Sequence, residues 1–428
     1  MNSENPDALH PALLNAATSA VEAALRFDQP ADVLLGQFFR THRSGGRDRG
    51  VIAEAVFAVL RRLRSLGALA AAVPGGPPQA RALTLLALAK GLGLSQRRLA
   101  GALRRGEAEW LAKVLAARPD IDDPAVRLDM PDWIFERLRR QADNDEIAAL
   151  CNGLNTTAPL DLRVNVMKGA RDAVLRTLQG EGLPATACPL APHGIRLQGR
   201  PAVNRHPLYE SGAIEVQDEG SQLLGLLLAP RRGELVVDFC AGAGGKTLLF
   251  GAMMRSTGRL HAFDVSAARL DKLGPRAARA GLSNVHPMVI DGSNDVRVKR
   301  LTGKADRVFV DAPCSGLGTL RRNPDLKWRQ SPQSVAELTA KQAVILAAAA
   351  RLVKPGGRLV YATCSILEEE NAGVVDAFLA AHPGFVRLSA PELLAGHDIV
   401  VTGGPDLRLT PHRDGTDGFY AAVLERSA

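Results

Sequence analysis

The sequence predicts an α/β protein with a doubly wound sheet in its C-terminal half, preceded by an all-helical region and a small α/β module. Three observations support this fold. From about residue 229, short apolar runs alternate with helical patterns. The stretch Val-Phe-Val-Asp-Ala-Pro-Cys at residues 308–314 is typical of a buried strand that ends at a rigid turn. A glycine-rich loop at residues 240–246 follows the first strand of this half.

Composition bounds the class of protein. A chain of 428 residues with 46% hydrophobic and 23% charged residues is typical of a globular protein of two or three domains. The net charge of +8 favours a nucleic-acid partner, and the low aromatic content of 4% favours phosphate contacts over base stacking. The sequence contains no apolar run of membrane-spanning length, and its first residues lack a signal-peptide pattern. We therefore expect a cytoplasmic protein without membrane contact.

Residues 1–145 are rich in Ala and Leu at helical spacing, so we expect a compact helical bundle. The predicted helices cover residues 11–26, 30–41, 47–67, 81–91, 95–104 and 107–118, and a further helix reaches about residue 141. Arginine pairs recur on these helices, which as a set indicates a surface for a polyanion.

Residues 146–228 show a different pattern. Alternating residues at 160–166 predict a strand, residues 170–180 predict a helix, and residues 194–197 predict a second strand. A unit of this kind is consistent with a small RNA-contacting (RRM-like) module and equally with a structural spacer. The pattern does not decide between them.

Residues 229–428 predict the doubly wound, mostly parallel sheet. The expected strands cover residues 234–239, 259–265, 285–290, 305–311, 357–363 and 419–425. The expected helices include residues 246–255, 267–280, 334–352 and 369–380. In such a sheet, ligands bind beyond the carboxyl ends of the strands.

The loop after the first strand reads Cys-Ala-Gly-Ala-Gly-Gly-Lys. A phosphate-binding Walker loop needs glycine where Cys240 stands, and a dinucleotide fingerprint needs glycine where Thr247 stands. The remaining pattern, Asp-x-x-x-Gly-x-Gly, is typical of methyltransferases that use S-adenosylmethionine. Asp264 and Asp291 close the next two strands, where carboxylates can take the ribose and lie near the adenine. The expected cofactor loop is Cys240, Ala241, Gly242, Ala243, Gly244, Gly245 and Lys246.

Cysteine usage points to chemistry rather than to disulfides or metal. The chain has five cysteines, none in a Cys-x-x-Cys pair, and no histidine spacing completes a zinc site. We therefore expect no metal. Cys240, Cys314 and Cys364 fall at predicted strand ends. The strands that carry Cys314 and Cys364 are expected to be neighbours, so that both thiols face one crevice beside Asp311.

Paired thiols suit methylation of a cytosine at carbon 5. This carbon is a poor nucleophile, and addition of a thiolate at carbon 6 pushes electron density onto it. A nearby acid stabilises the adduct at ring nitrogen 3. Methylation of nitrogen or oxygen would need no thiol. Spacing alone does not tell whether Cys314 or Cys364 attacks.

Several motifs together resemble the NOL1/NOP2/Sun family of RNA 5-methylcytosine methyltransferases. They are Gly-Gly-Arg-Asp-Arg at 45–49, Val-Gln-Asp-Glu-Gly-Ser-Gln at 216–222, Asp-Ala-Pro-Cys-Ser-Gly at 311–316, Arg-Asn-Pro-Asp at 322–325, Ala-Thr-Cys-Ser at 362–365 and Asp-Gly-Phe-Tyr at 417–420. The resemblance implies a class I S-adenosylmethionine-dependent methyltransferase domain at 229–428. It also implies an RNA-contacting module at 146–228 and a NusB-like RNA-binding domain at 1–145.

The resemblance also implies residue roles. Cys364 would be the nucleophile, Cys314 would assist release of methylated RNA, and Asp311 would hydrogen-bond the cytosine beside the cofactor. Residues 240–246, Asp264 and Asp291 would bind S-adenosylmethionine. The substrate would be a cytosine of small-subunit (16S) ribosomal RNA, and we expect a monomer. The family loop commonly reads Ala-Pro where this chain has Gly242-Ala243, and this loss of proline is expected to loosen the loop.

Two other functions are compatible with parts of the pattern. An RNA-binding assembly factor could carry an inactive methyltransferase domain, although the retained acids and thiols argue against this. A nitrogen-directed DNA methyltransferase could use Asp-Ala-Pro-Cys as a variant of its own motif, which would leave the second thiol idle.

Overall fold

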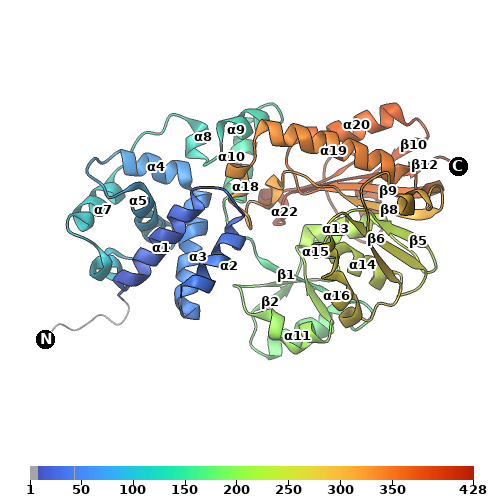
Figure 1. Cartoon of the computed structure of the whole chain (residues 1–428), viewed down its shortest axis with the longest axis horizontal. Helices are drawn as coiled ribbons and strands as arrows, with labels where there is room; N and C mark the ends of the chain where they lie inside the picture. The colour runs from blue at the N-terminus through green and yellow to red at the C-terminus, as the bar shows by residue number, and fades with distance from the viewer. Residues whose placement is uncertain (1–7, 43) are drawn as a thin grey trace. The chain divides into compact units, whose positions relative to one another are not determined.

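The computed structural model describes residues 8–42 and 44–428, which form two compact units (Figure 1). Unit 1 comprises Met1–Thr156 with Leu320–Ser331, and unit 2 comprises Thr157–Thr319 with Pro332–Ala428. The N-terminal stretch that lacks a signal-peptide pattern lies outside the described residues. The division into domains at 1–145, 146–228 and 229–428 stays a prediction.

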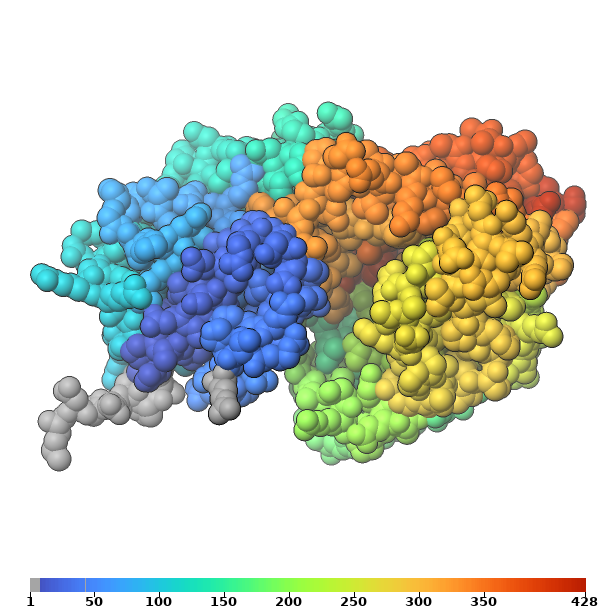
Figure 2. Space-filling model, in the orientation of Figure 1, coloured from blue at the N-terminus to red at the C-terminus, as the bar shows by residue number. Residues whose placement is uncertain are grey.

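The described part of unit 1 contains helices and no strand. Its helices are α1 (Pro11–Ala24), α2 (Ala31–Thr41), α3 (Gly46–Arg61), α4 (Leu63–Ala71), α5 (Gln79–Leu86), α6 (Gln96–Leu99), α7 (Glu107–Ala116), α8 (Pro124–Arg127), α9 (Asp132–Leu138), α10 (Asn144–Leu154) and α18 (Leu326–Arg329). Leucines, valines and alanines spaced three and four apart on α1, α3 and α5 form one buried core. In the space-filling view, α1, α2 and α3 present one continuous blue surface (Figure 2).

Two predicted helices of this unit are wrong in extent. The single helix expected over 47–67 is broken because the backbone of Arg62 leaves the helical region, with φ −123° and ψ 32°. The helix expected over 95–104 ends at Leu99 and continues only as a short 3₁₀ turn. Apolar spacing continues through both breaks, so it could not reveal them.

The segment Leu320–Ser331 packs into unit 1 although it lies between two parts of unit 2 in the chain. Its Lys327 side chain is fully buried, and Nζ donates hydrogen bonds of 2.8 Å to the carbonyl of Arg61 and to Asn155 Oδ1. Burial lowers the pKa of Lys327 to about 7. This lysine therefore ties the segment to the helical core.

Unit 2 contains a small antiparallel sheet with the strand order β2-β3-β1-β4. The strands are β1 (Leu160–Val164), β2 (Ala185–Ala187), β3 (Gly194–Leu197) and β4 (Ile214–Val216), with α11 (Arg171–Gly180) and α12 (Pro207–Glu210) as its helices. Val174 and Leu178 of α11 pack on Leu162 and Ile195. The two strands and the helix expected in this region are confirmed.

The larger sheet has eight strands, with the path β10-β12-β9-β8-β5-β6-β7 and β11 paired to β12. The strands are β5 (Leu235–Asp238), β6 (Arg259–Asp264), β7 (Val285–Val289), β8 (Ala305–Asp311), β9 (Val353–Thr363), β10 (Phe385–Leu388), β11 (Leu407–Leu409) and β12 (Phe419–Arg426). Strands β5 to β9 pair in parallel, and β12 runs antiparallel to β9. The expected doubly wound sheet is confirmed; β10 and β11 were not expected.

Helices cover both faces of this sheet (Figure 1). The helices of this part of the chain are α13 (Glu219–Leu228), α14 (Gly245–Met253), α15 (Ala267–Leu270), α16 (Leu273–Ala280), α17 (Val296–Lys299), α19 (Pro332–Ala350), α20 (Ala372–Ala381), α21 (Ala390–Ala395) and α22 (Pro411–Asp414). Along β8, Val308 and Val310 share a core with α19 and α20, whereas Phe309 shares the opposite core with α13 and α14. This alternation follows from the two-residue period of a strand.

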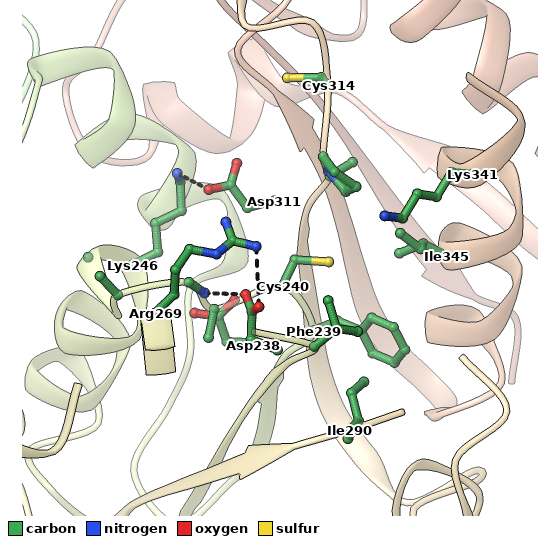
Figure 3. A pocket seen from close by; sticks show the side chains of 18 of the residues that line it. Asp238, Phe239, Cys240, Lys246, Arg269, Ile290, Asp311, Cys314, Lys341 and Ile345 are labelled. Atoms are coloured by element: carbon green, nitrogen blue, oxygen red, sulfur yellow. Dashed lines mark hydrogen bonds and ion pairs between the residues drawn. The ribbon is translucent and has the colours of Figure 1, made fainter. Parts of the chain in front are cut away.

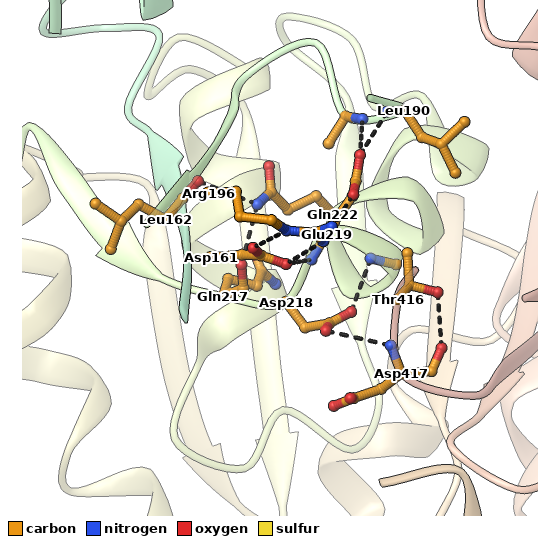
Figure 4. Close-up of polar contacts among 12 residues, drawn as sticks. Asp161, Leu162, Leu190, Arg196, Gln217, Asp218, Glu219, Gln222, Thr416 and Asp417 are labelled. Carbon is orange, nitrogen blue, oxygen red and sulfur yellow. Dashed lines mark hydrogen bonds and ion pairs between the residues drawn. The ribbon is translucent and has the colours of Figure 1, made fainter. Parts of the chain in front are cut away.

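Charged side chains join the two sheets at the motif of residues 216–222 (Figure 4). Asp161 of β1 accepts hydrogen bonds of 2.8 and 2.9 Å from Arg196 of β3, which also donates to Glu219 of α13 at 3.0 Å. Both carboxylates are buried, and with Cys188 they form a cluster of three possible metal ligands within 4.8 Å. Because the guanidinium occupies both carboxylates, the cluster acts as a joint between the sheets.

Candidate active site

A cavity of about 860 Å³ lies beyond the carboxyl ends of β5, β6, β8 and β9, all within unit 2 (Figure 3). This is the position at which open α/β sheets bind ligands. Most of the residues predicted for the site line it, namely Cys240, Ala241, Gly242, Ala243, Gly245, Lys246, Asp264, Asp291, Asp311, Cys314 and Cys364. Residues outside the predicted site also line it, among them Gln217, Asp238, Arg269 and Lys341; Gln217 and Asp238 lie in motifs noted in the sequence, although no site role was predicted for them.

The predicted cofactor loop turns sharply between β5 and α14. Gly242 and Gly244 have positive φ of 55° and 86°, a conformation that favours glycine. Gly244 does not line the cavity; a Cβ atom there would lie 2.2 Å from the side chain of Leu273. Its role is therefore to let the loop pass close to α16. Gly245 and Lys246, the first residues of α14, line the cavity.

Asp238 ends β5 beneath this loop. Its Oδ2 accepts a 2.6 Å hydrogen bond from the Thr247 hydroxyl, whereas its buried Oδ1 has no hydrogen-bond partner among the described residues. Burial raises the pKa of Asp238 to about 7. A cationic donor in the cavity would satisfy the second oxygen, and the α-ammonium of S-adenosylmethionine is such a donor.

The two acids predicted to follow the loop have different surroundings. Asp264, at the end of β6, is buried, and it accepts 2.8 Å hydrogen bonds from the N–H groups of Gly242 and Ser266. It thus holds the cofactor loop directly and retains further lone pairs. The side chain of Asp291 is 93% exposed and lies 3.5 Å from Arg297. Both line the same cavity, as a ligand with a ribose and a base requires.

Lys246 and Asp311 form an ion pair across the cavity, with Nζ 2.7 Å from Oδ2 (Figure 3). Burial acts to lower the pKa of Lys246, but the Asp311 carboxylate outweighs it and raises that pKa above its ordinary value. Lys246 comes from α14 and Asp311 from the end of β8. The pair therefore connects the cofactor loop with the strand that leads to Cys314.

The two thiols converge because β8 and β9 are parallel neighbours. The Sγ atoms of Cys314 and Cys364 lie 3.4 Å apart, and both residues line the cavity. The hydrogen bond to Cys364, together with burial, raises the pKa of Cys314 well above its ordinary value. Cys314 is thus a protonated thiol at neutral pH. The predicted adjacency of the two strand ends is confirmed.

Glu370 holds both cysteine turns, and sequence reasoning missed it. Its fully buried carboxylate accepts hydrogen bonds from the N–H and hydroxyl of Ser315 and from the hydroxyl of Ser365, the residues that follow the two cysteines. Gln342 of α19 donates to the same carboxylate at 3.0 Å and to the carbonyl of Pro313 at 3.0 Å. In the sequence Glu370 ends a run of three glutamates, a pattern typical of an exposed surface.

The remaining cysteines lie apart from this pair. Cys240 lines the cavity, and burial raises the pKa of its thiol. Cys151 lies in a buried position of unit 1, and Cys188 lies at the joint between the two sheets. The three cysteines predicted at strand ends are therefore the three that reach the cavity.

The residues present fit S-adenosylmethionine. Asp238 offers an unpaired carboxylate oxygen for the ammonium, and Asp264 and Asp291 offer carboxylates for the ribose and the base. Ile290, Phe239 and Val265 add apolar lining. None of the helices formed by residues 8–42 and 44–428 has the length and apolar character that a membrane span requires.

Two family models match the chain. The model described as 16S rRNA methyltransferase RsmB/F matches residues 225–425, and the model described as an RsmF/B-like ferredoxin-like domain matches residues 130–204. The chain is 32% identical to a probable ribosomal RNA small subunit methyltransferase B of Synechocystis, over 94% of this chain and 96% of that protein. It is 35% identical to ribosomal RNA small subunit methyltransferase B of Sodalis glossinidius, over 71% and 67%.

Solved structures share the fold. The structure of a protein named PH0851 superposes with a TM-score of 0.77 and 26% identity, covering 98% of this chain and 99% of that chain. A methyltransferase homologue from Pyrococcus horikoshii matches with a TM-score of 0.61 and 25% identity, covering 72% of this chain and all of that one. NSun6 from the same organism, solved with SFG, has a TM-score of 0.62 at 20% identity, covering 70% and 98%, which compares the fold alone.

Proposed function

The chain belongs to the 16S rRNA methyltransferase RsmB/F family, and from that premise we propose that it methylates carbon 5 of a cytosine through a covalent cysteine adduct. It is a methyltransferase of small-subunit ribosomal RNA, and its cofactor is S-adenosylmethionine. The position of the methyl group and the covalent step are our inference. The observation that carries them is the pair of thiols 3.4 Å apart beside the Lys246–Asp311 pair.

The cofactor is proposed to lie along residues 240–246. Asp238 would accept from its ammonium, and Asp264 and Asp291 would contact the ribose and the base. When bound, S-adenosylmethionine supplies an electrophilic methyl group. Burial of Asp238 favours its neutral form, so contact with an ammonium group should ionise it. Asp238 is thereby added to the predicted cofactor residues.

Cys364 is proposed to attack carbon 6 of the flipped cytosine as a thiolate. The new carbon–sulfur bond moves an electron pair toward carbon 5, which then takes the methyl group. Asp311 is proposed to hydrogen-bond the ring and stabilise the adduct, with Lys246 holding its carboxylate in place. A hydrogen bond from the Cys314 thiol would stabilise the Cys364 thiolate before attack.

Cys314 is proposed to act at the end of the reaction. A water molecule or another base takes the proton from carbon 5, the electron pair of that carbon–hydrogen bond forms the double bond to carbon 6, and the carbon–sulfur bond breaks with its electron pair going to sulfur. The Cys364 sulfur would leave as a thiolate. The raised pKa of Cys314 keeps its thiol protonated, and this thiol lies close enough to donate a hydrogen bond to the departing sulfur. Loss of this proton source would leave the RNA attached to Cys364.

RNA binding is proposed to involve both remaining parts of the chain. The net charge of +8 supports contacts with the phosphate backbone. Unit 1 would act as the NusB-like RNA-binding domain, and the small antiparallel sheet as an RNA-contacting module. We further propose that the protein acts as a monomer in the cytoplasm, where its ribosomal RNA substrate is made.

Nucleoside analysis of the product tests this function. The purified protein is incubated with unmodified 16S ribosomal RNA and S-adenosylmethionine, and the digested RNA is analysed by mass spectrometry. We expect 5-methylcytidine. Methylation at a cytidine nitrogen, or product on DNA in preference to RNA, would contradict the proposal.

A further inference from the structure

Two arginines that do not line the cavity donate hydrogen bonds to the cofactor loop. Arg276 of α16 donates a 2.5 Å hydrogen bond to the carbonyl of Ala243, and Arg163 of β1 donates a 2.8 Å hydrogen bond to the carbonyl of Gly245. Neither arginine lines the cavity. The loop is rich in glycine, which loses more conformational entropy on ordering than any other residue. Hydrogen bonds from residues outside the loop therefore help to order a segment that would otherwise be flexible.

The small sheet positions both arginines. Glu215 of β4 is buried and pairs with Arg276 at 3.1 Å. Gln217, just after β4, accepts a hydrogen bond from Arg163. Burial lowers the pKa of Arg163 to about 10, which still leaves the guanidinium charged at neutral pH. Because guanidinium groups are fixed forks of donors, the position of their partners decides which carbonyls they reach.

Helix α16 is itself seated on the small sheet. Asn165, which follows β1, donates to the carbonyl of Ala280 at 2.9 Å, and Lys168 donates to the carbonyl of Arg279 at 2.7 Å. These bonds satisfy carbonyls that the end of a helix leaves without partners. At the other end of α16, Leu273 packs beneath Gly244. The helix thus connects the small sheet with the cofactor loop.

We propose that Arg163 and Arg276 are positioning residues for S-adenosylmethionine, and that the small sheet sets cofactor affinity through Glu215 and Gln217. The loop binds the cofactor only in the one backbone conformation that these bonds favour. They also act against the loosening expected from the missing proline. The proposal depends on the cofactor alone and holds whichever cysteine attacks the RNA.

Two arginines that share Glu215 provide a matched test. Arg276 hydrogen-bonds both Glu215 and the loop, whereas Arg279 pairs with Glu215 and stacks on Tyr209, and no hydrogen bond among the described residues joins its side chain to the loop. Calorimetric titration of the full-length protein with S-adenosylmethionine, without RNA, should give a Kd about ten-fold higher for Arg276→Met. Arg279→Met should change the Kd less than about two-fold. An equal effect of both variants would overturn the proposal.

A double-mutant cycle tests whether Glu215 acts through Arg276. Glu215→Gln should raise the Kd, and the double variant with Arg276→Met should bind no more weakly than Arg276→Met alone. If the increases in Kd caused by the two single substitutions multiply in the double variant, Glu215 does not act through Arg276. If Arg276→Met fails to fold, Arg276→Lys takes its place, since lysine keeps the charge without the fork. In turnover assays, KM for the cofactor should rise while kcat at saturation stays within about two-fold; a fall in kcat with unchanged KM would overturn the positioning role.

Discussion

The sulfur atoms of Cys314 and Cys364 lie 3.4 Å apart, although 50 residues separate them in the chain. Parallel pairing of β8 and β9 brings the two strand ends together, and the buried Glu370 carboxylate holds the serine after each cysteine. Asp311 and Lys246 lie in the same cavity. This arrangement supports the proposed roles of Cys364 as nucleophile, Cys314 as proton donor and Asp311 as the acid that binds the ring.

Removal of Cys364 should abolish turnover. Cys364→Ala cannot form the bond to carbon 6, so we expect methyl transfer to 16S ribosomal RNA to fall by about a thousand-fold or more. The assay measures labelled methyl groups in RNA. Cys151→Ala, which removes a buried thiol of unit 1, is the control for loss of a cysteine as such. Turnover of Cys364→Ala near the wild-type rate would exclude its role as nucleophile.

Cofactor binding should release protons below pH 7. Asp238 has a pKa of about 7 in the folded protein, so at pH 6 its carboxyl group is mostly protonated. An ammonium group beside it favours the carboxylate, and binding should therefore expel a proton. Calorimetry in buffers of different ionisation enthalpy measures the number of protons that are released on binding. Asp238→Asn should release none and should bind about ten-fold more weakly; equal proton release by both proteins would contradict the assignment.

Glu370→Gln should disturb both cysteine turns together. The amide NH₂ cannot accept the hydrogen bonds that Ser315, Ser365 and Gln342 donate, so at least one buried donor loses its partner at a cost of about 1–3 kcal/mol. We expect kcat to fall about ten-fold or more, and thermal unfolding to occur at lower temperature. Glu368→Gln is the control, since Glu368 forms an exposed ion pair with Arg408. Equal activity of both variants would show that Glu370 does not order the thiols.

Lys327 should make stability rise with pH. Its pKa is about 7 when folded and near 10.5 when unfolded, so between these values the unfolded chain binds one more proton than the folded chain. The free energy of unfolding should therefore increase from pH 7 to pH 10, by on the order of a few kcal/mol. Lys327→Met should lose this increase. Urea unfolding at several pH values measures the free energy of unfolding. If this free energy changes with pH in the same way for the wild-type protein and Lys327→Met, the lysine is not buried in its neutral form.

The sequence was sufficient for the parts of the site that depend on strand ends. Alternating apolar runs predicted β5 to β9, and strand order then implied that Cys314 and Cys364 meet. The contacts of Glu370, Arg163 and Arg276 could not be predicted in this way. Most of their partners are distant in the chain, and a buried charge in a polar stretch has no periodic signature. The cofactor role predicted for Gly244 stays a prediction; this glycine does not line the cavity, and a Cβ atom there would lie 2.2 Å from the Leu273 side chain.

The packing of Leu320–Ser331 into unit 1 could also not be predicted from the sequence. The segment contains Arg321, Lys327 and Arg329, and arginine and lysine are residue types that are mostly exposed in folded proteins. Only the fold supplies the carbonyl and amide oxygens that make burial of Lys327 possible. Tertiary hydrogen bonds, which apolar periodicity does not encode, decide such positions.

The covalent step can be tested by locating the attachment site of trapped RNA. Cys314→Ala is incubated with S-adenosylmethionine and 16S ribosomal RNA, and the denatured, nuclease-treated adduct is digested and sequenced by mass spectrometry. We expect a nucleotide with a methylated cytosine on the peptide that contains Cys364. An adduct on any other residue, or continued turnover of this variant with no adduct, would contradict it.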